Sequence, residues 1–309
     1  MADDIIDEGR ASRGLVDAVS RELADRLSRP LAPGLYLLAT PIGNLADVSL
    51  RALAVMATAD IVYCEDTRHS RKLLDCYGIR RRLRAYHEHN EDTEQVSAVA
   101  ELARGQTVAL LSDAGTPLVS DPGFKLVRAA IAGGHSVFAV PGASAVLAAL
   151  CASGLPSDTF TFAGFLPSKS GQRQERLSEL RHVIGTLLFF EAPSRLQATL
   201  GALGDAFGPA TPGAVARELT KLHEELRRGS LAELAQWAAS AELRGEFVIL
   251  VAPVRSAERH VSDEEIRAAI AGQTAGTFRD QVDAVAALLR APRKRVYDIG
   301  LQSRKDRRP

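Results

Sequence analysis

The chain has 309 residues, of which 46% are hydrophobic and 25% charged, and its formal net charge is zero. This length predicts roughly two domains of ordinary size with substantial cores. The sequence has no apolar run near the ~20 residues that a membrane span requires, and its acidic N-terminus lacks the pattern of a signal peptide. Three widely spaced cysteines, Cys64, Cys76 and Cys151, argue against a disulfide framework or a zinc site and favour a reducing cytoplasm.

Residues 1–32 are expected to form an extension ahead of the folded core. Apolar residues recur there at the spacing of one helical face, which predicts a helix. These residues are Leu15, Val19, Leu23 and Leu27. The Pro- and Gly-containing stretch 29–34 ends the pattern.

Strand and helix patterns alternate between residues 33 and 144. The expected strands cover residues 35–40, 61–66, 83–88, 108–113 and 136–140. The expected helices cover residues 49–59, 69–77, 92–104 and 123–132. Such alternation predicts a mainly parallel sheet with helices on both faces, so residues 33–144 are interpreted as an N-terminal α/β domain.

Residues 145–254 are interpreted as a second α/β domain. An apolar helix opens it after residues 141–144 and ends near Gly154. Strand-like runs follow at residues 159–165, 186–192, 214–219 and 246–253, and helix-like segments follow Gly171, Pro193 and Ser230. Because these strands are polar at their ends, a mixed sheet is expected.

The character of the chain changes after Pro253, and residues 255–309 are interpreted as a small helical, basic module. Helices are expected at residues 263–271, 277–289 and 293–302. Ser262 and Glu265 have the spacing of a capping box. Two short helices joined by a tight turn are typical of a helix-turn-helix, although any three-helix tail has the same pattern.

Three loops rich in small residues follow strands of the first domain. They are residues 39–44 (ATPIGN), 112–117 (SDAGTP) and 141–144 (PGAS), and the second belongs to the Gly- and Pro-rich segment 111–123. The carboxyl ends of parallel strands share one edge of a sheet, so these loops can converge on a ligand that approaches the backbone closely. The alternative for each loop is an ordinary turn. The sequence contains neither G-x-G-x-x-G after the first strand nor a P-loop motif, so a nicotinamide dinucleotide or P-loop site is not predicted.

Charged and polar residues gather at three strand ends, in residues 65–68, 86–90 and 217–221. They fit the wall of a catalytic cleft, with surface ion pairs as the alternative. His87 and His89 alternate on an expected strand, but no third ligand is near in sequence, so no metal site is predicted.

Basic residues form two runs in this neutral chain. The first run contains Arg68, Arg71, Lys72, Arg80, Arg81, Arg82 and Arg84, and the second contains Arg293, Lys294, Arg295, Arg304, Lys305, Arg307 and Arg308. Each run is either a solvated face or a contact for a polyanion.

Eight motifs match one family in order and spacing. They are ATPIGNLADVSLRAL, CEDTRHSRKLL, HEHN, LLSDAGTPLVSDPG, PGASAVLAALCASGLP, FAGFLPSKSGQR, RELTK and GEF. Together they resemble the ribosomal RNA small subunit methyltransferase I family, in the tetrapyrrole-methylase-like class (class III) of S-adenosylmethionine-dependent methyltransferases. The resemblance spans about residues 33–253.

This resemblance implies a two-domain α/β methyltransferase with the cofactor cleft between the domains, usually a homodimer. It implies 2′-O-methylation of a cytidine ribose in small-subunit (16S) ribosomal RNA, with free rRNA or the assembled small subunit as partner. No membrane and no metal partner is expected. The cofactor, S-adenosyl-L-methionine, would contact Thr40, Pro41, Ile42, Gly43, Asp113, Ala114, Gly115, Thr116, Pro117 and Ser144, and from the second domain parts of Phe190-Glu191, Ala216-Arg217 and Gly245-Glu246.

One departure from the family pattern concerns residues 191–195. The family typically has E-x-P-H-R there, whereas this chain has EAPSR, so Ser194 is not included in the expected site.

Methyl transfer from a sulfonium to a ribose hydroxyl is mainly a positioning task, to which a general base adds roughly 10²- to 10⁴-fold. The candidate bases are Glu65, His87, Glu88, Lys169 and Lys221, and orientation alone is the alternative. The expected RNA contacts are Arg68, Arg71, Arg80, Arg81, Arg82, Arg84, Arg293, Lys294 and Arg295.

Two other functions fit parts of the pattern. A precorrin or uroporphyrinogen methyltransferase would have the same architecture but would not need the basic runs or the helical tail. A noncatalytic RNA-binding protein would use the tail but would leave the three small-residue loops unexplained.

Overall fold

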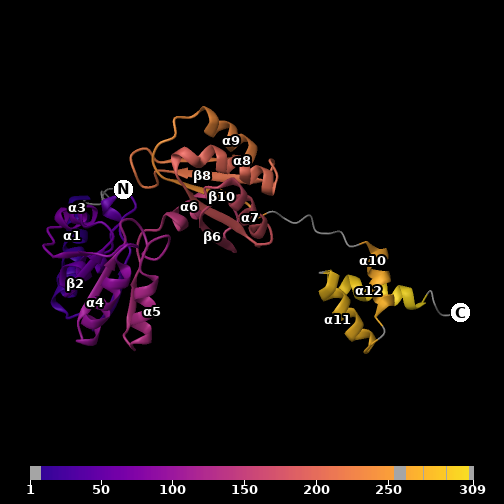
Figure 1. Ribbon diagram of the computed structural model, residues 1–309, viewed down its shortest axis with the longest axis horizontal. Helices are drawn as coiled ribbons and strands as arrows, with labels where there is room; N and C mark the ends of the chain where they lie inside the picture. Colours follow the sequence, from indigo (N-terminus) through magenta and orange to yellow (C-terminus); the bar gives the residue numbers. More distant parts are fainter. Residues whose placement is uncertain (1–7, 254–261, 274, 290, 306–309) are drawn as a thin grey trace, which may run out of the picture. The chain divides into compact units, whose positions relative to one another are not determined.

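The computed structural model describes residues 8–253, 262–273, 275–289 and 291–305. The chain divides into two compact units, Met1–Pro253 and Val254–Pro309 (Figure 1). Each unit has buried cores of its own.

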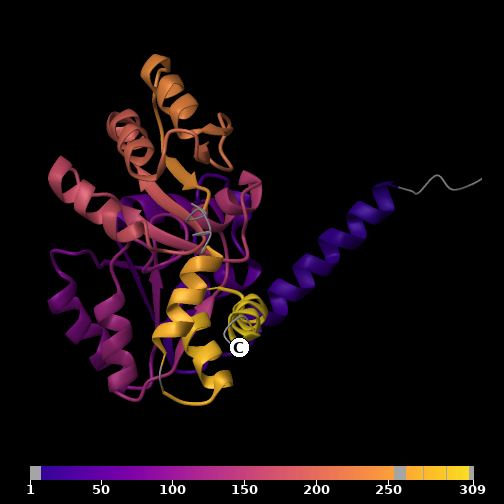
Figure 2. The ribbon, with the colours of Figure 1, turned by 90° about the vertical axis from the view of Figure 1, so that its right-hand side faces the viewer.

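The first unit begins with the predicted N-terminal helix, α1 (Glu8–Ser28). Figure 2 shows α1 extending away from the rest of this unit. Of its apolar face, Leu23 packs against the core beside α2 (Leu50–Thr58), whereas Leu15 is 67% exposed. The helix is therefore anchored near its C-terminal end.

The first sheet is entirely parallel, which confirms the prediction from the strand–helix alternation. Its strands are β1 (Gly34–Leu38), β2 (Ile61–Cys64), β3 (Leu83–Ala85), β4 (Thr107–Leu111) and β5 (Val137–Val140), in the order β3-β2-β4-β1-β5. Alternate residues of each strand point to opposite faces, so Leu35 packs in one core and Tyr36 in the other. Helices α2 and α3 (Thr67–Cys76) cover one face, and α4 (Glu91–Ala103) and α5 (Phe124–Ala132) cover the other.

The second sheet is mixed, as predicted. Its strands are β6 (Phe160–Phe165), β7 (Thr186–Glu191), β8 (Pro212–Arg217), β9 (Glu225–Ser230) and β10 (Phe247–Val251), in the order β6-β7-β10-β8-β9. Only the β6–β7 pair is parallel among them. Helices α7 (Ser170–Leu180), α8 (Leu196–Phe207) and α9 (Leu231–Ser240) pack on one face, and α6 (Ala145–Ser153) packs on the other.

One local expectation was wrong, and one strand was missed. The strand expected at residues 83–88 ends at Ala85, and His87–Asn90 form a turn in which Asn90 Oδ1 accepts a hydrogen bond from the His87 amide. The edge strand β9 was not predicted, because its sequence ELRRGS is polar and it forms through pairing with β8.

The second unit is a three-helix module, as predicted. Its helices are α10 (Asp263–Gly272), α11 (Phe278–Leu289) and α12 (Arg293–Lys305). The expected capping box is present, with the Ser262 and Glu265 side chains each bonded to the other's backbone amide. Buried Ile, Val and aromatic side chains give this unit a core of its own. No helix among the residues described in either unit is both long and apolar enough to cross a bilayer.

Candidate functional site

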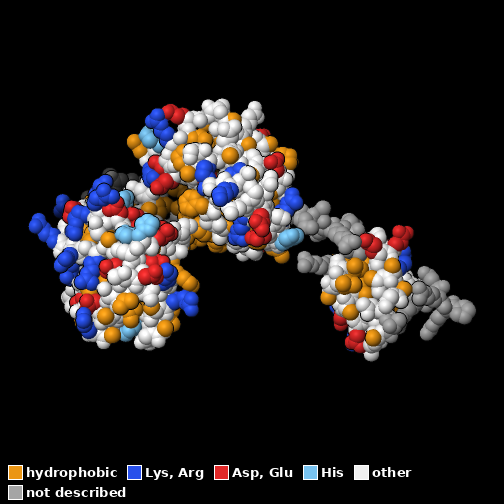
Figure 3. Space-filling model, in the orientation of Figure 1, with side chains coloured by type: hydrophobic (Ala, Val, Ile, Leu, Met, Phe, Trp, Pro, Cys, Tyr) orange, Lys and Arg blue, Asp and Glu red, His pale blue; other side chains and the backbone are white. Residues whose placement is uncertain are grey.

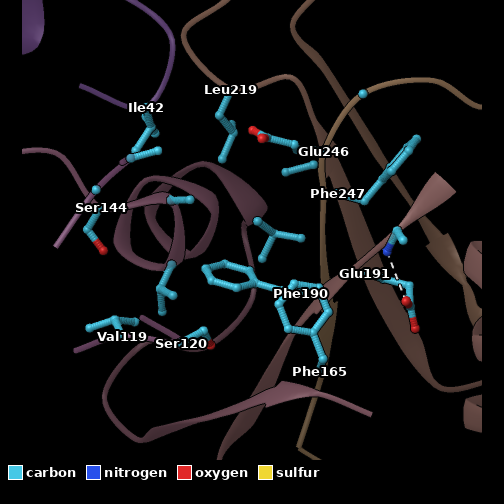
Figure 4. A pocket seen from close by; sticks show the side chains of 18 of the residues that line it. Ile42, Val119, Ser120, Ser144, Phe165, Phe190, Glu191, Leu219, Glu246 and Phe247 are labelled. Atoms are coloured by element: carbon cyan, nitrogen blue, oxygen red, sulfur yellow. Dashed lines mark hydrogen bonds between the residues drawn. The ribbon is translucent and has the colours of Figure 1, made fainter. Parts of the chain in front are cut away.

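A pocket of about 360 Å³ lies where the carboxyl edge of the first sheet meets the α6 face of the second sheet (Figure 4). Its lining is Ile42, Ala114, Gly115, Thr116, Val119, Ser120, Asp121, Ser144, Ala145, Val146, Phe165, Phe190, Glu191, Ala192, Pro193, Ala216, Leu219, Gly245, Glu246, Phe247 and Val248. A pocket of this size, mostly apolar with a few polar groups, is typical of a small-molecule or cofactor site.

Loops of the first sheet reach the pocket through backbone-special positions. Gly115 has φ +79° and forms an isolated antiparallel bridge with Thr40, in which each amide donates to the other's carbonyl. A Cβ at Gly115 would lie 3.3 Å from Ile42 Cγ2. The backbone of these two loops can therefore approach a ligand closely because residue 115 has no side chain.

The next segment of the same loop is strained. Leu118 and Ser120 have φ of +71° and +66°, in the left-handed region that non-glycine residues rarely adopt. A side chain at Gly164 of β6 would lie 3.7 Å from Ser120 Oγ, so this loop extends as far as the second sheet. Strain of this kind persists where surrounding contacts hold it, and it concentrates at functional sites.

The second sheet contributes apolar side chains and a tight loop. Phe190 packs edge-on against Phe165, with ring centroids 5.7 Å apart, and both lie at one wall of the pocket (Figure 4). A Cβ on Gly245 would lie 2.4 Å from the Glu218 carboxylate, so the 245–246 loop can pack against residue 218 only because position 245 is glycine.

Lys221 joins two carboxylates beside the pocket. Its Nζ lies 2.8 Å from Glu218 Oε1 and 3.0 Å from Glu246 Oε2. Burial lowers the pKa of Lys221, but the hydrogen bonds to the two carboxylates outweigh it and raise the pKa overall. The hydrogen bond from Lys221 likewise holds the pKa of Glu218 below its ordinary value. Lys221 and Glu218 are therefore both charged near neutral pH. Lys221 holds the 245–246 loop through its two ion pairs and is not free to act as a base.

Nine of the predicted cofactor-binding residues line the pocket. They are Ile42, Ala114, Gly115, Thr116, Ser144, Glu191, Ala216, Gly245 and Glu246, and the implied Phe190 joins them. Thr40, Pro41, Gly43, Asp113, Pro117 and Arg217 stand outside this lining. Two of these support it instead: Thr40 is buried and donates to the Ser112 carbonyl, and Asp113 accepts from the Asp66 amide.

Sequence reasoning missed eleven lining residues. They are Val119, Ser120, Asp121, Ala145, Val146, Phe165, Ala192, Pro193, Leu219, Phe247 and Val248. For Val119, Ser120 and Asp121 a signal was present, because they belong to the Gly- and Pro-rich segment 111–123. The others follow or interrupt apolar runs, and nothing in a single sequence marks which of them face the pocket.

None of the five candidate bases belongs to the pocket lining in the described structure. Glu65 follows β2 and is half-buried; burial raises its pKa, and the negative charges of Asp121 and Asp113 raise it further. His87 is half-buried with its Nδ1 unpartnered among the described residues. Glu88 and Lys169 are exposed.

The first basic run divides into exposed and structural members. Lys and Arg side chains gather over the α3 side of the first sheet (Figure 3). Arg71 donates to the Arg81 carbonyl and Arg81 to the Ala57 carbonyl, while Arg68 pairs with Asp66. Arg84 donates to the Tyr63 hydroxyl. Arg68, Arg80, Arg82 and Arg84 are exposed, and of these Arg68 and Arg84 have the partners just named.

The basic residues that open α12 are partly engaged within their own unit. Arg293 pairs with Asp283, and Arg295 lies 2.7 Å from Asp263. Lys294 is exposed. Arg304 and Lys305 end α12, but their side chains, together with Arg307 and Arg308, lie outside the part of the chain described here.

Among the described residues, no group of three or more His, Cys, Asp or Glu side chains is arranged to hold a metal ion.

Comparison with known proteins agrees with this architecture. The family model for tetrapyrrole (corrin/porphyrin) methylases matches residues 34–235. A ribosomal RNA small subunit methyltransferase I of Mesorhizobium japonicum is 59% identical over 230 residues, 74% of this chain and 78% of that protein. A protein of the same name from Micromonospora olivasterospora is 41% identical over 298 residues, 94% of this chain and 93% of that protein.

A solved structure shares the fold. It is a uroporphyrin-III C-methyl transferase from Thermus thermophilus complexed with S-adenyl homocysteine, with a TM-score of 0.51 and 21% identity over 72% of this chain and 98% of that one. The matched family, the two sheets and the pocket between them lead to one conclusion. The chain belongs to the tetrapyrrole methylase family and, within it, to the ribosomal RNA small subunit methyltransferases I.

Proposed function

We propose that this methyltransferase moves a methyl group from S-adenosylmethionine to the 2′-hydroxyl of a cytidine ribose in small-subunit ribosomal RNA. The observation that carries the proposal is the pocket, which combines the small-residue loops of one sheet with the α6 face of the other. Relatives of this chain that share most of its length bear the name of an rRNA methyltransferase, which supports rRNA as the substrate.

The residues of the pocket fit S-adenosylmethionine. The cofactor combines a flat adenine, a ribose and a charged amino-acid tail, and the pocket offers aromatic rings together with backbone groups and hydroxyls. Residues 114–116 and 245 would approach it through the backbone, and Ser144 and Thr116 would offer hydroxyls. A Cβ at residue 115 would lie 3.3 Å from Ile42 Cγ2. Glycine at this position therefore leaves space in the pocket for the cofactor that a side chain would occupy.

The cofactor, when bound, supplies an electrophilic methyl group on a positively charged sulfur. The protein's own residues therefore have to exclude water, align the ribose hydroxyl with the methyl–sulfur bond and receive a proton. The strained loop at Leu118 and Ser120 and the loop held by Lys221 are fixed elements suited to that alignment.

The RNA is proposed to bind over the α3 side of the first sheet. Arg68, Arg80 and Arg82 are exposed there and are suited to phosphates. Arg71, Arg81 and Arg84, also predicted as contacts, already donate hydrogen bonds within the protein, so they support this surface. Lys294 is the exposed member of the three basic residues that open α12.

We also propose that the protein is cytoplasmic and forms a homodimer. Its domains are proposed to cover residues 33–144, 145–254 and 255–309. The free rRNA and the assembled small subunit are both candidate substrates, and one assay compares them.

The test is methyl transfer from tritiated S-adenosylmethionine to small subunits, or to their extracted rRNA, from a strain lacking the corresponding enzyme. Nuclease digestion followed by mass spectrometry should yield 2′-O-methylcytidine. Uroporphyrinogen III in a parallel reaction should acquire no label. Labelling of the tetrapyrrole, or binding of RNA with no transfer at all, would refute the proposal.

A further inference from the structure

We propose that Asp121 is a catalytic residue, the carboxylate that takes the proton from the ribose hydroxyl. The inference deepens the proposed function and rests on it. It stands on four features of Asp121: its place in the pocket, its unused oxygen, its contact with Ser112 and its position toward the proposed RNA surface.

Three carboxylates line the pocket, and two of them are committed to other partners. Glu191 is 3% exposed; its Oε1 accepts from the Ala192 amide and its Oε2 from the Thr199 hydroxyl at 2.6 Å. Glu246 Oε2 pairs with Lys221. Glu191 therefore has no oxygen left for a substrate, whereas Glu246 is 76% exposed and its charge is compensated by Lys221.

Asp121 is different. Only its Oδ2 takes part in a hydrogen bond within the described residues, with the Ser112 hydroxyl. The other oxygen, Oδ1, remains available on a side chain that lines the pocket. The carboxylate is thus fixed at one oxygen and open at the other, which suits a general base.

The contact with Ser112 indicates that Asp121 can hold a proton. Ser112 Oγ also lies 3.0 Å from the Ala114 carbonyl oxygen. A hydroxyl has one proton and cannot donate to both acceptors. With a proton on Oδ1, Oδ2 still accepts from the Ser112 hydroxyl; with a proton on Oδ2, Asp121 donates to Ser112 while Ser112 donates to the Ala114 carbonyl. The pair therefore accommodates both protonation states without rearrangement.

The surroundings of Asp121 raise its pKa overall. Burial raises its pKa, against the lowering effect of the Ser112 hydrogen bond, and the negative charge of Asp113 raises it further. Glu65 at the end of β2 also faces this group, since the charge of Asp121 contributes to its own raised pKa. A carboxylate with a raised pKa is a stronger base than a solvated one.

Asp121 also lies in the loop that follows β4, at the carboxyl edge of the first sheet. It lines the pocket and interacts with the charges of Glu65 and Asp113, which follow β2 and β4 at the same edge. The chain enters α3 two residues after Glu65, and the exposed Arg68 lies in the first turn of α3, whereas Arg80 and Arg82 come after α3, ahead of β3. RNA bound at Arg68 would bring a ribose to this carboxyl edge of the sheet, where Asp121 lies in the same loop as the strained Leu118 and Ser120.

In the proposed step the ribose oxygen forms a bond to the methyl carbon, and the methyl–sulfur bond breaks with its electron pair remaining on sulfur. The hydroxyl proton passes to Asp121 Oδ1, and the carboxylic acid then releases it to water before the next turnover.

The experiment compares wild type with Asp121→Asn, which keeps the shape and removes the base. Steady-state methyl transfer to small subunits is measured from pH 5 to 9, and S-adenosylhomocysteine binding is measured by titration calorimetry. We expect a loss of kcat by roughly 10²- to 10⁴-fold, with KM for the subunit and the cofactor-product affinity unchanged. The exposed Asp205→Asn on α8 is the matched control and should behave as wild type.

A second variant reports on protonation. Ser112→Ala removes the hydrogen bond that lowers the Asp121 pKa, so the acid limb of the kcat profile should move to higher pH. A wild-type kcat and acid limb in Asp121→Asn would overturn the inference while leaving the proposed function intact. Loss of S-adenosylhomocysteine binding in that variant would also overturn it, because Asp121 would then be a cofactor ligand. A wild-type protein that binds S-adenosylhomocysteine but methylates no rRNA would refute the proposed function and the inference together.

Discussion

The backbone amide of Asn44 donates a 3.1 Å hydrogen bond to Thr220 Oγ1, across 176 positions of sequence. It joins the loop after β1 of the first sheet to the loop after β8 of the second. Thr220 has φ +65° and its own amide donates to Glu224 Oε2, so it is held in a strained conformation that presents its hydroxyl to Asn44. This contact fixes one side of the pocket.

Thr220→Val should loosen that contact while keeping the shape of the side chain. The Asn44 amide would lose its acceptor, which costs about 0.5–1.5 kcal/mol. We expect a lower melting temperature and several-fold weaker binding of S-adenosylhomocysteine in calorimetry. Thr93→Val, at an exposed position on α4, is the control and should leave the affinity unchanged. Equal affinities for both variants would show that this contact does not shape the pocket.

Gly115→Val should abolish or strongly weaken cofactor binding. The added side chain would strain a backbone with φ +79° and would meet Ile42 inside the pocket. A loss of tenfold or more in affinity, about 1.4 kcal/mol, is expected in a variant that still melts cooperatively.

The matched control for Gly115 is Gly105→Val. Gly105 has φ +78°, so the backbone strain is the same, but an added Cβ there would meet no atom within 4 Å. Both variants should lose stability, and only Gly115→Val should lose affinity. A pair of variants with equal affinities would reduce the Gly115 loop to an ordinary turn.

Reversing the charge at Arg80 and Arg82 together should weaken binding to rRNA. The salt dependence should become flatter, by roughly 0.7 to 0.9 in the slope of log K against log salt for each lost phosphate contact. Cofactor affinity should not change. Arg104→Glu, at the C-terminal cap of α4 on the face of the sheet opposite to α3, is the charge control.

Arg81 needs a separate comparison. Its guanidinium donates to the Ala57 carbonyl at 2.8 Å, so Arg81→Glu should lower the melting temperature. An unaltered salt slope in the Arg80 and Arg82 double variant would mean that this run is only a solvated face.

Lys221→Gln tests whether this lysine holds a loop or acts as a base. Because its ammonium pairs with two partly exposed carboxylates, we expect a stability loss of at most about 1 kcal/mol and a weaker cofactor affinity. The shape of the pH–rate profile should stay as in wild type. A lost acid or base limb would instead assign Lys221 to proton transfer.

The stability difference between wild type and Lys221→Gln should depend on pH. The folded pKa of Glu218 is lowered from an ordinary value of 4.5, so its stabilising pair is complete above that value. As the pH falls through the folded pKa, Glu218 gains a proton and the contribution disappears. Denaturant titrations should therefore show a difference at pH 7 that shrinks below pH 4. A difference that is constant with pH would exclude the ion pair as its cause.

Truncation after Pro253 should leave a folded enzyme. Residues 254–309 form a separate unit with its own core, so their removal exposes no core of the first unit. We expect normal cofactor binding, a higher KM for the ribosomal substrate and a nearly intact kcat, the pattern of lost uniform binding. A wild-type KM would assign the module to another task, and a collapse of kcat at saturating RNA would place part of the active site within it.

The sequence by itself determined the elements and their faces. The alternation of strand and helix patterns predicted a parallel sheet covered on both faces. The structure has this sheet, with Leu35 in the core on one face and Tyr36 in the core on the other. The Ser262 capping box and the three small-residue loops were also readable, because caps and turns depend on a few neighbouring residues. Parallel strands share a carboxyl edge, so the convergence of those loops followed from the same pattern.

Only the tertiary structure decided which partners each side chain meets. Strand β9 was invisible because the polar run ELRRGS becomes a strand only beside β8. Arg80 and Arg81 are adjacent arginines that the sequence pattern does not distinguish. In the structure the Arg81 guanidinium donates to the Ala57 carbonyl, whereas Arg80 is exposed. Lys221 looked like a free base until Glu246, 25 residues away, was found within 3.0 Å of it. Asp121 was hidden inside a recognised loop, because its contact with Ser112 and its place in the pocket depend on a fold that local patterns do not encode.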